Sequence, residues 1–238
     1  MLCRRFFPVA GRPLIVLALA VATAGLSNCV SFAARDETLD GNVASKGFRS
    51  GVHATLDAIL SGATGTYIGR VLADRDSTLE RWPDRVNDPL RVWVDSNSIV
   101  SGDQSGFPGA FRSAVAEWED TGIPLRFVYV NRARDADIRV RWTRYLEKKT
   151  GSTTWRTDRD GILDRADITL ATHMGDGRLL DDYGMRAIAL HELGHALGLS
   201  HSLDSHDIMS ALVHVDSLSQ PDRETIKLLY SLPPGHVR

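Results

Sequence analysis

Three histidines at fixed spacing and one acidic neighbour are the residues of this sequence best suited to chemistry. They lie in the run His191-Glu192-Leu193-Gly194-His195-Ala196-Leu197-Gly198-Leu199-Ser200-His201. If the start of this run is helical, His191 and His195 lie one turn apart on the same face, where two imidazoles can bind one tetrahedral zinc ion. Glu192 follows the first ligand, and we expect it to take a proton from water at the ion. The spacing therefore predicts a hydrolytic metal site.

The residues after the helix complete the predicted site. Gly198 predicts the end of the helix, because glycine adopts the left-handed conformation at little cost. The resulting turn would bring His201 back to the ion as a third ligand and leave the fourth position to water, as in catalytic zinc sites. His206 could replace His201 only if this turn failed to form. Met209 follows in Asp207-Ile208-Met209-Ser210, where a turn could lie beneath the metal. We predict one catalytic Zn²⁺.

The pattern H-E-x-x-H-x-x-G-x-x-H followed by a methionine turn resembles that of the metzincins. Ser202 directly after the third histidine, together with Asp204, resembles the matrixins, the matrix metalloproteinases and their bacterial relatives; Asp204 either caps a turn or supports the loop beyond His201. The resemblance implies a zinc-dependent endopeptidase that acts on proteins or peptides. A catalytically silent zinc-binding module of the cell envelope is the alternative. The functional residues that the resemblance implies are the catalytic Glu192, the metal ligands His191, His195 and His201, and Met209 of the Met-turn.

The elements that must position these residues follow from the hydrophobic periodicity. Phe111, Ala114, Val115 and Trp118 form one apolar stripe and predict a helix that ends near Gly122. Alternating or β-branched runs predict strands at 90–95, 125–130, 137–142, 153–157 and 166–171. Two further helices are expected, one that carries His191 and is capped by Asp181 and Asp182, and one that is opened by Pro221 and Asp222.

This order of elements matches a matrixin catalytic domain, and the resemblance covers Leu79 to Leu232. It implies an α+β, zincin or metzincin-like fold, with a twisted mixed five-stranded sheet, three helices and a Met-turn. The edge strand near 153–157 would run antiparallel and pair with an extended substrate, which is binding by strand addition.

The sequence departs from the vertebrate matrixins in two respects. No cysteine lies between Val30 and the histidines, so a propeptide cysteine cannot cover the zinc. The stretch 143–152 has no histidine, so we predict no second zinc. Asp158-Arg159-Asp160-Gly161 could hold calcium, but calcium is not otherwise supported, and a solvated hairpin turn is the favoured interpretation.

The remaining sequence bounds the organisation of the chain. Its 238 residues suit one domain plus a leader, and the net charge of −2 gives no reason to expect a nucleic-acid partner. We expect a signal peptide at 1–34, a flank or propeptide-like linker at 35–78 and a catalytic domain at 79–238. The linker is expected to contain one short helix near 52–60. We also expect a monomer.

The leader leaves two routes of processing open. Leu26-Ser27-Asn28-Cys29 resembles a lipoprotein signal, which would leave Cys29 lipidated and attach the protein to a membrane; the other route is cleavage near Ala33 or Ala34. Either route predicts an exported protein that is secreted, periplasmic or lipid-anchored at the cell envelope. Cys3 and Cys29 are the only cysteines, so a disulfide framework is excluded from the predicted domain.

Overall fold

The computed structural model describes residues 17–18, 63–95 and 106–237. The predicted signal peptide, except for 17–18, lies outside these residues, as do Cys29, the helix near 52–60 and the whole of the segment 35–62.

A mixed five-stranded sheet is the main layer of the structure, as predicted. Its strands lie in the order β4-β3-β5-β7-β6. All neighbouring strands are parallel except β6, which runs antiparallel to β7 at one edge. The strands are β3 (Arg85–Val94), β4 (Leu125–Tyr129), β5 (Ile138–Thr143), β6 (Gly151–Thr157) and β7 (Leu163–Ala171).

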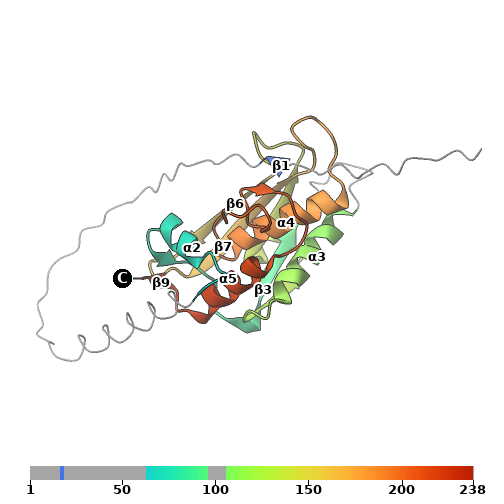
Figure 1. The fold of residues 1–238 in the computed structure, drawn as a ribbon. Helices are drawn as coiled ribbons and strands as arrows, with labels where there is room; N and C mark the ends of the chain where they lie inside the picture. Colours follow the sequence, from blue (N-terminus) through green and yellow to red (C-terminus); the bar gives the residue numbers. More distant parts are fainter. Residues whose placement is uncertain (1–16, 19–62, 96–105, 238) are drawn as a thin grey trace, which may run out of the picture.

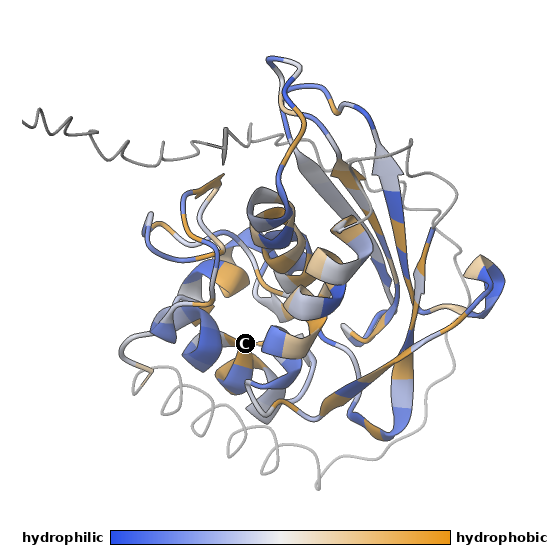
Figure 2. Ribbon diagram, turned by 90° about the vertical axis from the view of Figure 1, so that its right-hand side faces the viewer, coloured by the Kyte–Doolittle hydropathy of each residue, from blue (hydrophilic) through white to orange (hydrophobic). Residues whose placement is uncertain are grey.

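One face of the sheet is buried because apolar and polar residues alternate along its strands. In β5, Ile138, Val140 and Trp142 face the core, whereas Arg139 and Arg141 face the other side. Figure 2 shows this alternation along the strands, with the helices gathered on one side of the sheet. The buried face therefore needs a helical layer to cover it.

Two helices, α3 (Phe107–Glu119) and α4 (Asp182–Ala196), supply that layer. They pack side by side, α3 against β4 and α4 against β6 and β7 (Figure 1). The indole Nε1 of Trp118 donates a hydrogen bond to the Leu190 carbonyl at 3.0 Å and joins the two helices in the core. The helix α5 (Gln220–Ser231) follows in a smaller C-terminal part, and a capping box formed by Ser219 and Asp222 begins it.

The prediction of three helices was wrong by one. The described residues form four α-helices, because α2 (Ile68–Asp74) precedes the sheet. Ile68 and Val71 of α2 are buried in the common core, and the backbone N–H of Tyr67 donates to Thr225 Oγ1 on α5 at 3.0 Å. Residues within the segment expected to be a linker therefore contact the last helix directly.

Short elements join distant parts of the chain. β2 (Thr78–Leu79) pairs with β9 (Gly235–His236), and β1 (Leu17–Ala18) pairs with β8 (Leu212–Val213). A 3₁₀ turn, η1, spans Ala133–Asp135. No helix within the described ranges is long and apolar enough to cross a bilayer.

The turn between β6 and β7 is a hydrogen-bonded hairpin turn. Asp158 Oδ1 accepts hydrogen bonds from the backbone N–H groups of Asp160 and Ile162, both at 2.9 Å. The Asp158 carboxylate therefore stabilises the turn through these two hydrogen bonds.

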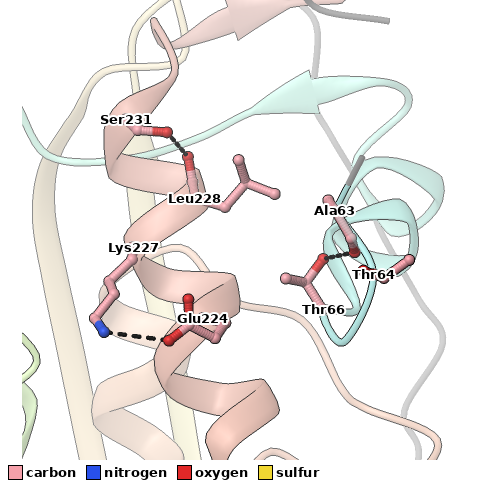
Figure 3. A pocket seen from close by; sticks show the side chains of 7 residues that line it. All are labelled: Ala63, Thr64, Thr66, Glu224, Lys227, Leu228 and Ser231. Atoms are coloured by element: carbon pink, nitrogen blue, oxygen red, sulfur yellow. Dashed lines mark hydrogen bonds and ion pairs between the residues drawn. The ribbon is translucent and has the colours of Figure 1, made fainter. Parts of the chain in front are cut away.

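A hollow lies where residues 63–66 approach α5 (Figure 3). Its polar contacts are local, such as Thr66 Oγ1 to the Ala63 carbonyl and Lys227 to Glu224. None of the residues that line it belongs to the predicted histidine site.

Candidate active site

The helix α4 carries the first two predicted ligands and is fixed at both ends. At its start, Asp181 Oδ1 accepts a hydrogen bond from the Gly184 N–H at 2.7 Å. At its end, the Gly198 N–H donates to the His195 carbonyl at 3.0 Å and the Leu199 N–H to the Gly194 carbonyl at 2.9 Å, which is a Schellman turn. Gly198 has φ +106°, and a Cβ there would overlap the Glu80 carbonyl oxygen, so the turn requires glycine.

The turn brings the three predicted ligands together. His195 Nε2 lies 3.1 Å from His191 Nε2 and 3.2 Å from His201 Nε2. A tetrahedral zinc ion with Zn–N bonds of about 2.05 Å requires N···N separations of about 3.3 Å. Within the part of the chain that the structure describes, these three form one group whose donor atoms could hold a metal.

The donor chemistry fits zinc as well as the distances do. His191 Nδ1 lies 2.8 Å from the Ile208 carbonyl oxygen, and His195 Nδ1 lies 2.9 Å from the Leu199 carbonyl oxygen. A carbonyl only accepts, so each Nδ1 carries the proton and each Nε2 presents a lone pair. Lone pairs that face one another at this distance repel unless a cation lies between them. The site therefore has the features of a metal centre.

Burial keeps the ligands neutral. Desolvation lowers the pKa of His191 to about 4, with a weaker opposing effect from its bond to Ile208. Desolvation is also the main cause of the lowered pKa values of His195 and His201. Metal binding needs unprotonated imidazoles, and these are present without any proton to displace at neutral pH.

The predicted Met-turn residue is buried beside α4. Met209 is fully buried, and a Cβ at Gly194 would overlap its sulfur atom. The Ser202 N–H donates to the Met209 carbonyl at 2.8 Å, and the Ser202 hydroxyl donates to Asp207. The segment after His201 is thus bonded to the methionine turn through the serine that follows the third ligand.

A buried carboxylate on α5 supports the Met-turn. Asp222 Oδ2 accepts hydrogen bonds from the N–H groups of Ile208 at 2.8 Å and Ser219 at 2.9 Å, and Tyr67 donates its hydroxyl to Asp222 Oδ1 at 2.8 Å. Because the Ile208 carbonyl receives His191 Nδ1, one chain of contacts runs from Asp222 through the main chain of Ile208 to the predicted ligand His191. Such outer contacts orient metal ligands.

A second chain of contacts reaches His195 from α2. Arg75, the C-cap residue of α2, donates through Nη2 to the Leu199 carbonyl at 3.3 Å, the same oxygen that receives His195 Nδ1. Its guanidinium is paired with Glu80 and lies 4.4 Å from the ring centroid of Trp155 on β6. Trp155 Nε1 also donates to Glu80 at 2.8 Å. These contacts hold the Arg75 side chain where it can donate to the carbonyl oxygen that also receives His195 Nδ1.

The predicted catalytic carboxylate points from α4 toward the edge strand. Glu192 is buried, and its Oε2 accepts a hydrogen bond from the Thr153 hydroxyl at 2.6 Å. Desolvation raises its pKa to about 7, against the opposing effects of the Thr153 bond and the charge of Lys149. A carboxylate in this state can both accept and return a proton near neutral pH.

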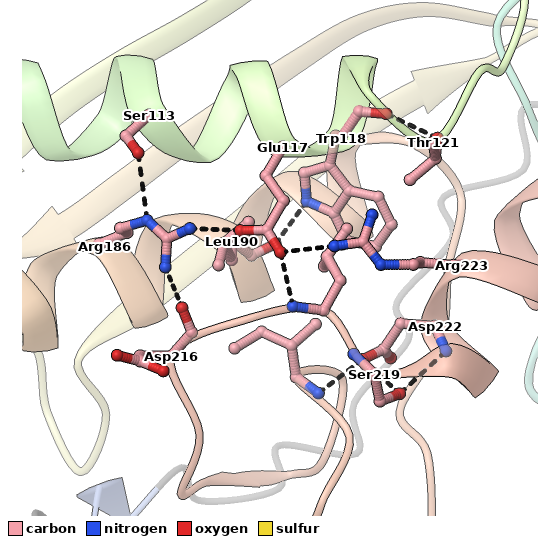
Figure 4. A network of polar contacts seen from close by, with 12 residues as sticks. Ser113, Glu117, Trp118, Thr121, Arg186, Leu190, Asp216, Ser219, Asp222 and Arg223 are labelled. Carbon is pink, nitrogen blue, oxygen red and sulfur yellow. Dashed lines mark hydrogen bonds and ion pairs between the residues drawn. The ribbon is translucent and has the colours of Figure 1, made fainter.

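The loop after the Met-turn is held by a polar network around Glu117 on α3 (Figure 4). Glu117 accepts from the Leu218 N–H at 2.9 Å and pairs with Arg186 and Arg223. Arg186 also donates to the Asp216 carbonyl. One half-buried carboxylate thus connects α3, α4, this loop and α5.

The alternative ligand His206 lies apart from the site. Its ring is 87% exposed, and Nδ1 lies 2.8 Å from Asp204 Oδ1. Asp204 Oδ1 also accepts the His206 N–H at 2.9 Å, so Asp204 caps this turn.

Sequence reasoning missed several supporting residues. Asp222 was recognised only as a helix-opening residue, although the spacing of Ser219 and Asp222 indicates a capping box. Arg75, Thr153 and Glu117 gave no signal, because the contacts that connect them to Leu199, Glu192 and Leu218 span 39 or more positions along the chain.

A comparison with protein families identifies the family of this chain. The family model described as Matrixin matches residues 93–231, which is more than half of the chain and includes the three histidines and Met209. No curated protein matches the sequence.

Proposed function

Because the chain belongs to the matrixin family of zinc-dependent metallopeptidases, we propose that it is an exported endopeptidase in which Glu192 is the general base. The observation that carries this proposal is the convergence of three imidazole Nε2 atoms, from His191, His195 and His201, on a helix and turn where the buried Glu192 directly follows His191. The fold alone would not assign the activity, whereas this group of residues has the composition of a hydrolytic centre.

The three histidines would hold the ion, and Glu192 would handle the proton. When bound, zinc supplies Lewis acidity that lowers the pKa of water and polarises the scissile carbonyl. Glu192 accepts the proton of the attacking water and then donates it to the leaving amine, which restores the carboxylate. The bonds from His191 and His195 to backbone carbonyls keep their Nε2 atoms in the ligating tautomer throughout.

The peptide substrate would bind along β6. This strand is the antiparallel edge of the sheet, so its outer N–H and C=O groups can pair with an extended chain. The loop 211–217, with Leu212 exposed and Val213 buried, would form the wall of the pocket for the side chain beyond the cut. The Glu117 network stabilises this loop, because Glu117 accepts from the Leu218 N–H and its partner Arg186 donates to the Asp216 carbonyl.

We further propose that the enzyme acts outside the cytoplasm. The leader 1–34 supports export, and Cys29 in its lipoprotein-like context supports attachment to a membrane. Mass spectrometry of the mature N-terminus tests both: a diacylated Cys29 supports anchoring, a start near Ala34 supports release, and an intact Met1 in the cell fraction contradicts export.

The experiment that tests the activity compares three proteins on casein and on a quenched peptide library: the wild type, Glu192→Gln, and Glu224→Gln as a control on the exposed face of α5. We expect chelator-sensitive cleavage by the wild type and the control. Glu192→Gln should retain zinc but lose activity by about 10²-fold or more. A wild type that binds zinc and cleaves nothing would support the silent zinc-binding module instead, and an active Glu192→Gln would refute the role of the base.

A further inference from the structure

The inner face of β6 meets the side chain of Glu192. Gly151 and Thr153 are two residues apart, so both face α4, whereas Ser152 and Thr154 face away. The outer edge of the same strand is the proposed substrate-binding edge. Thus the strand that contacts the Glu192 carboxylate on its inner face is also the strand whose outer edge is proposed to bind the substrate backbone.

The Thr153 hydroxyl is placed to hold the carboxylate. Thr153 Oγ1 lies 2.6 Å from Glu192 Oε2 and 3.0 Å from the Glu192 backbone oxygen. A hydroxyl has a single proton, and the shorter contact, to the charged acceptor, is the stronger hydrogen bond. This bond restricts the rotation of a side chain that has three rotatable bonds.

Gly151 leaves the space that the other carboxylate oxygen fills. A Cβ at this position would overlap Glu192 Oε1. Gly151 is not among the glycines with positive φ, so the backbone itself would accept alanine. The requirement for glycine is therefore one of space beside the carboxylate.

We propose that Thr153 and Gly151 are positioning residues for Glu192, which fix the general base to the strand that receives the substrate. The inference rests on the proposed function, because it assigns these residues to that reaction. Thr153 binds one carboxylate oxygen and Gly151 makes room for the other, so the two together define a single position for the group.

A positioning role differs in its kinetics from a structural one. A misplaced base slows the chemical step, so kcat falls while KM, which reflects binding along β6, changes little. A purely structural threonine would instead alter stability or zinc content and leave the kcat of the folded fraction intact.

The test compares Thr153→Val, which keeps the shape and removes the hydroxyl, with Thr153→Ser, which keeps the hydroxyl. Gly151→Ala displaces the carboxylate without removing a donor. Thr169→Val on β7 is the matched control, because Thr169 lies on the outer face of the sheet. Measurements are kcat and KM on a quenched peptide, zinc content, thermal unfolding, and crystal structures of the wild type and Thr153→Val with zinc bound.

We expect kcat to fall about 10- to 100-fold in Thr153→Val and in Gly151→Ala, with KM and zinc content nearly unchanged. Thr153→Ser and Thr169→Val should retain wild-type kcat. Wild-type kcat in Thr153→Val, or an equal loss in Thr153→Ser, would overturn the inference. If the wild type itself cleaves no peptide, the proposed function fails, and the crystal structures decide separately: an unmoved Glu192 carboxylate in Thr153→Val overturns the positioning role.

Discussion

The hydroxyl of Tyr67 offers a sharp test of how far the folded unit extends toward the N-terminus. Tyr67 precedes the expected domain start at Leu79, yet its hydroxyl donates a hydrogen bond to the buried Asp222 at 2.8 Å. Burial, followed by the charge of Asp222, raises the pKa of Tyr67 well above its ordinary value, so the hydroxyl remains a donor. Tyr67→Phe removes this one oxygen and keeps the ring.

The expected loss follows from the contacts that remain. Without the hydroxyl, the Asp222 Oδ1 atom keeps only the weak contact with the Met209 N–H at 3.4 Å, while Oδ2 keeps its bonds to Ile208 and Ser219. A hydrogen bond to a charged group contributes about 1.5–3 kcal/mol. For a domain of this size the loss corresponds to a decrease in melting temperature of about 3–12 °C.

The assay is urea unfolding of the metal-free protein, followed by tryptophan fluorescence, because bound metal would add its own stabilisation. Tyr145→Phe is the control, since that hydroxyl is exposed and contacts only the neighbouring Arg144. If Tyr67→Phe unfolds within about 0.5 kcal/mol of the wild type, as surface substitutions do, the contact with Asp222 does not stabilise the fold and the reasoning fails.

Three further predictions concern the metal site. Arg75→Lys cannot reproduce both the bond to the Leu199 carbonyl and the stacking on Trp155, so zinc affinity measured by chelator competition should fall about 10-fold. Arg70→Lys, on the exposed side of α2, is the control, and equal zinc affinities of the two variants would contradict the role of Arg75. Gly198→Ala should destabilise by at least about 2 kcal/mol in urea, because φ is +106° and the methyl group meets the Glu80 carbonyl; an unchanged midpoint would exclude this. In the metal-free protein, the lowered pKa of His191, about 4 against 6.5, gives stability that is present above pH 6.5 and lost as the pH falls toward 4, whereas the raised pKa of Glu192, about 7 against 4.5, gives the opposite slope. Glu192→Gln removes the opposing slope, and the lowered pKa values of His195 and His201 act in the same direction as that of His191, so unfolding curves of this variant should show a loss of at least about 3 kcal/mol between pH 6.5 and 4. A flat profile would refute the assignment.

The centre of the site was predictable from the sequence because its residues are close along the chain. Helical periodicity places His191 and His195 on one face, and a glycine with a positive φ is the physical requirement for the return of His201. The five strands were predictable for a similar reason, since alternation along each strand is a local pattern. The fold class and the family are confirmed.

The helix α2 was not predictable in the same way. It has seven residues, too few for periodicity to distinguish it, and it is stabilised mainly by tertiary packing of Ile68 and Val71. Residues 61–66, rich in glycine and threonine, precede it and suggested a linker. A composition that favours a turn does not exclude contacts made by the residues that follow.

The contacts that orient His191 and His195 are made by main-chain carbonyl groups, which is why they cannot be predicted from the sequence. The carbonyls of Ile208 and Leu199 are main-chain atoms, so the Nδ1 contacts of His191 and His195 do not depend on the residue type at these two positions. What the sequence can select are the side chains one step further out, Asp222 on the Ile208 N–H and Arg75 on the Leu199 carbonyl. Asp222 lies within the family match and Arg75 lies before it. An element outside the matched residues thus contacts the predicted zinc site, and we expect loss of α2 to weaken metal binding even though it removes none of the three histidines.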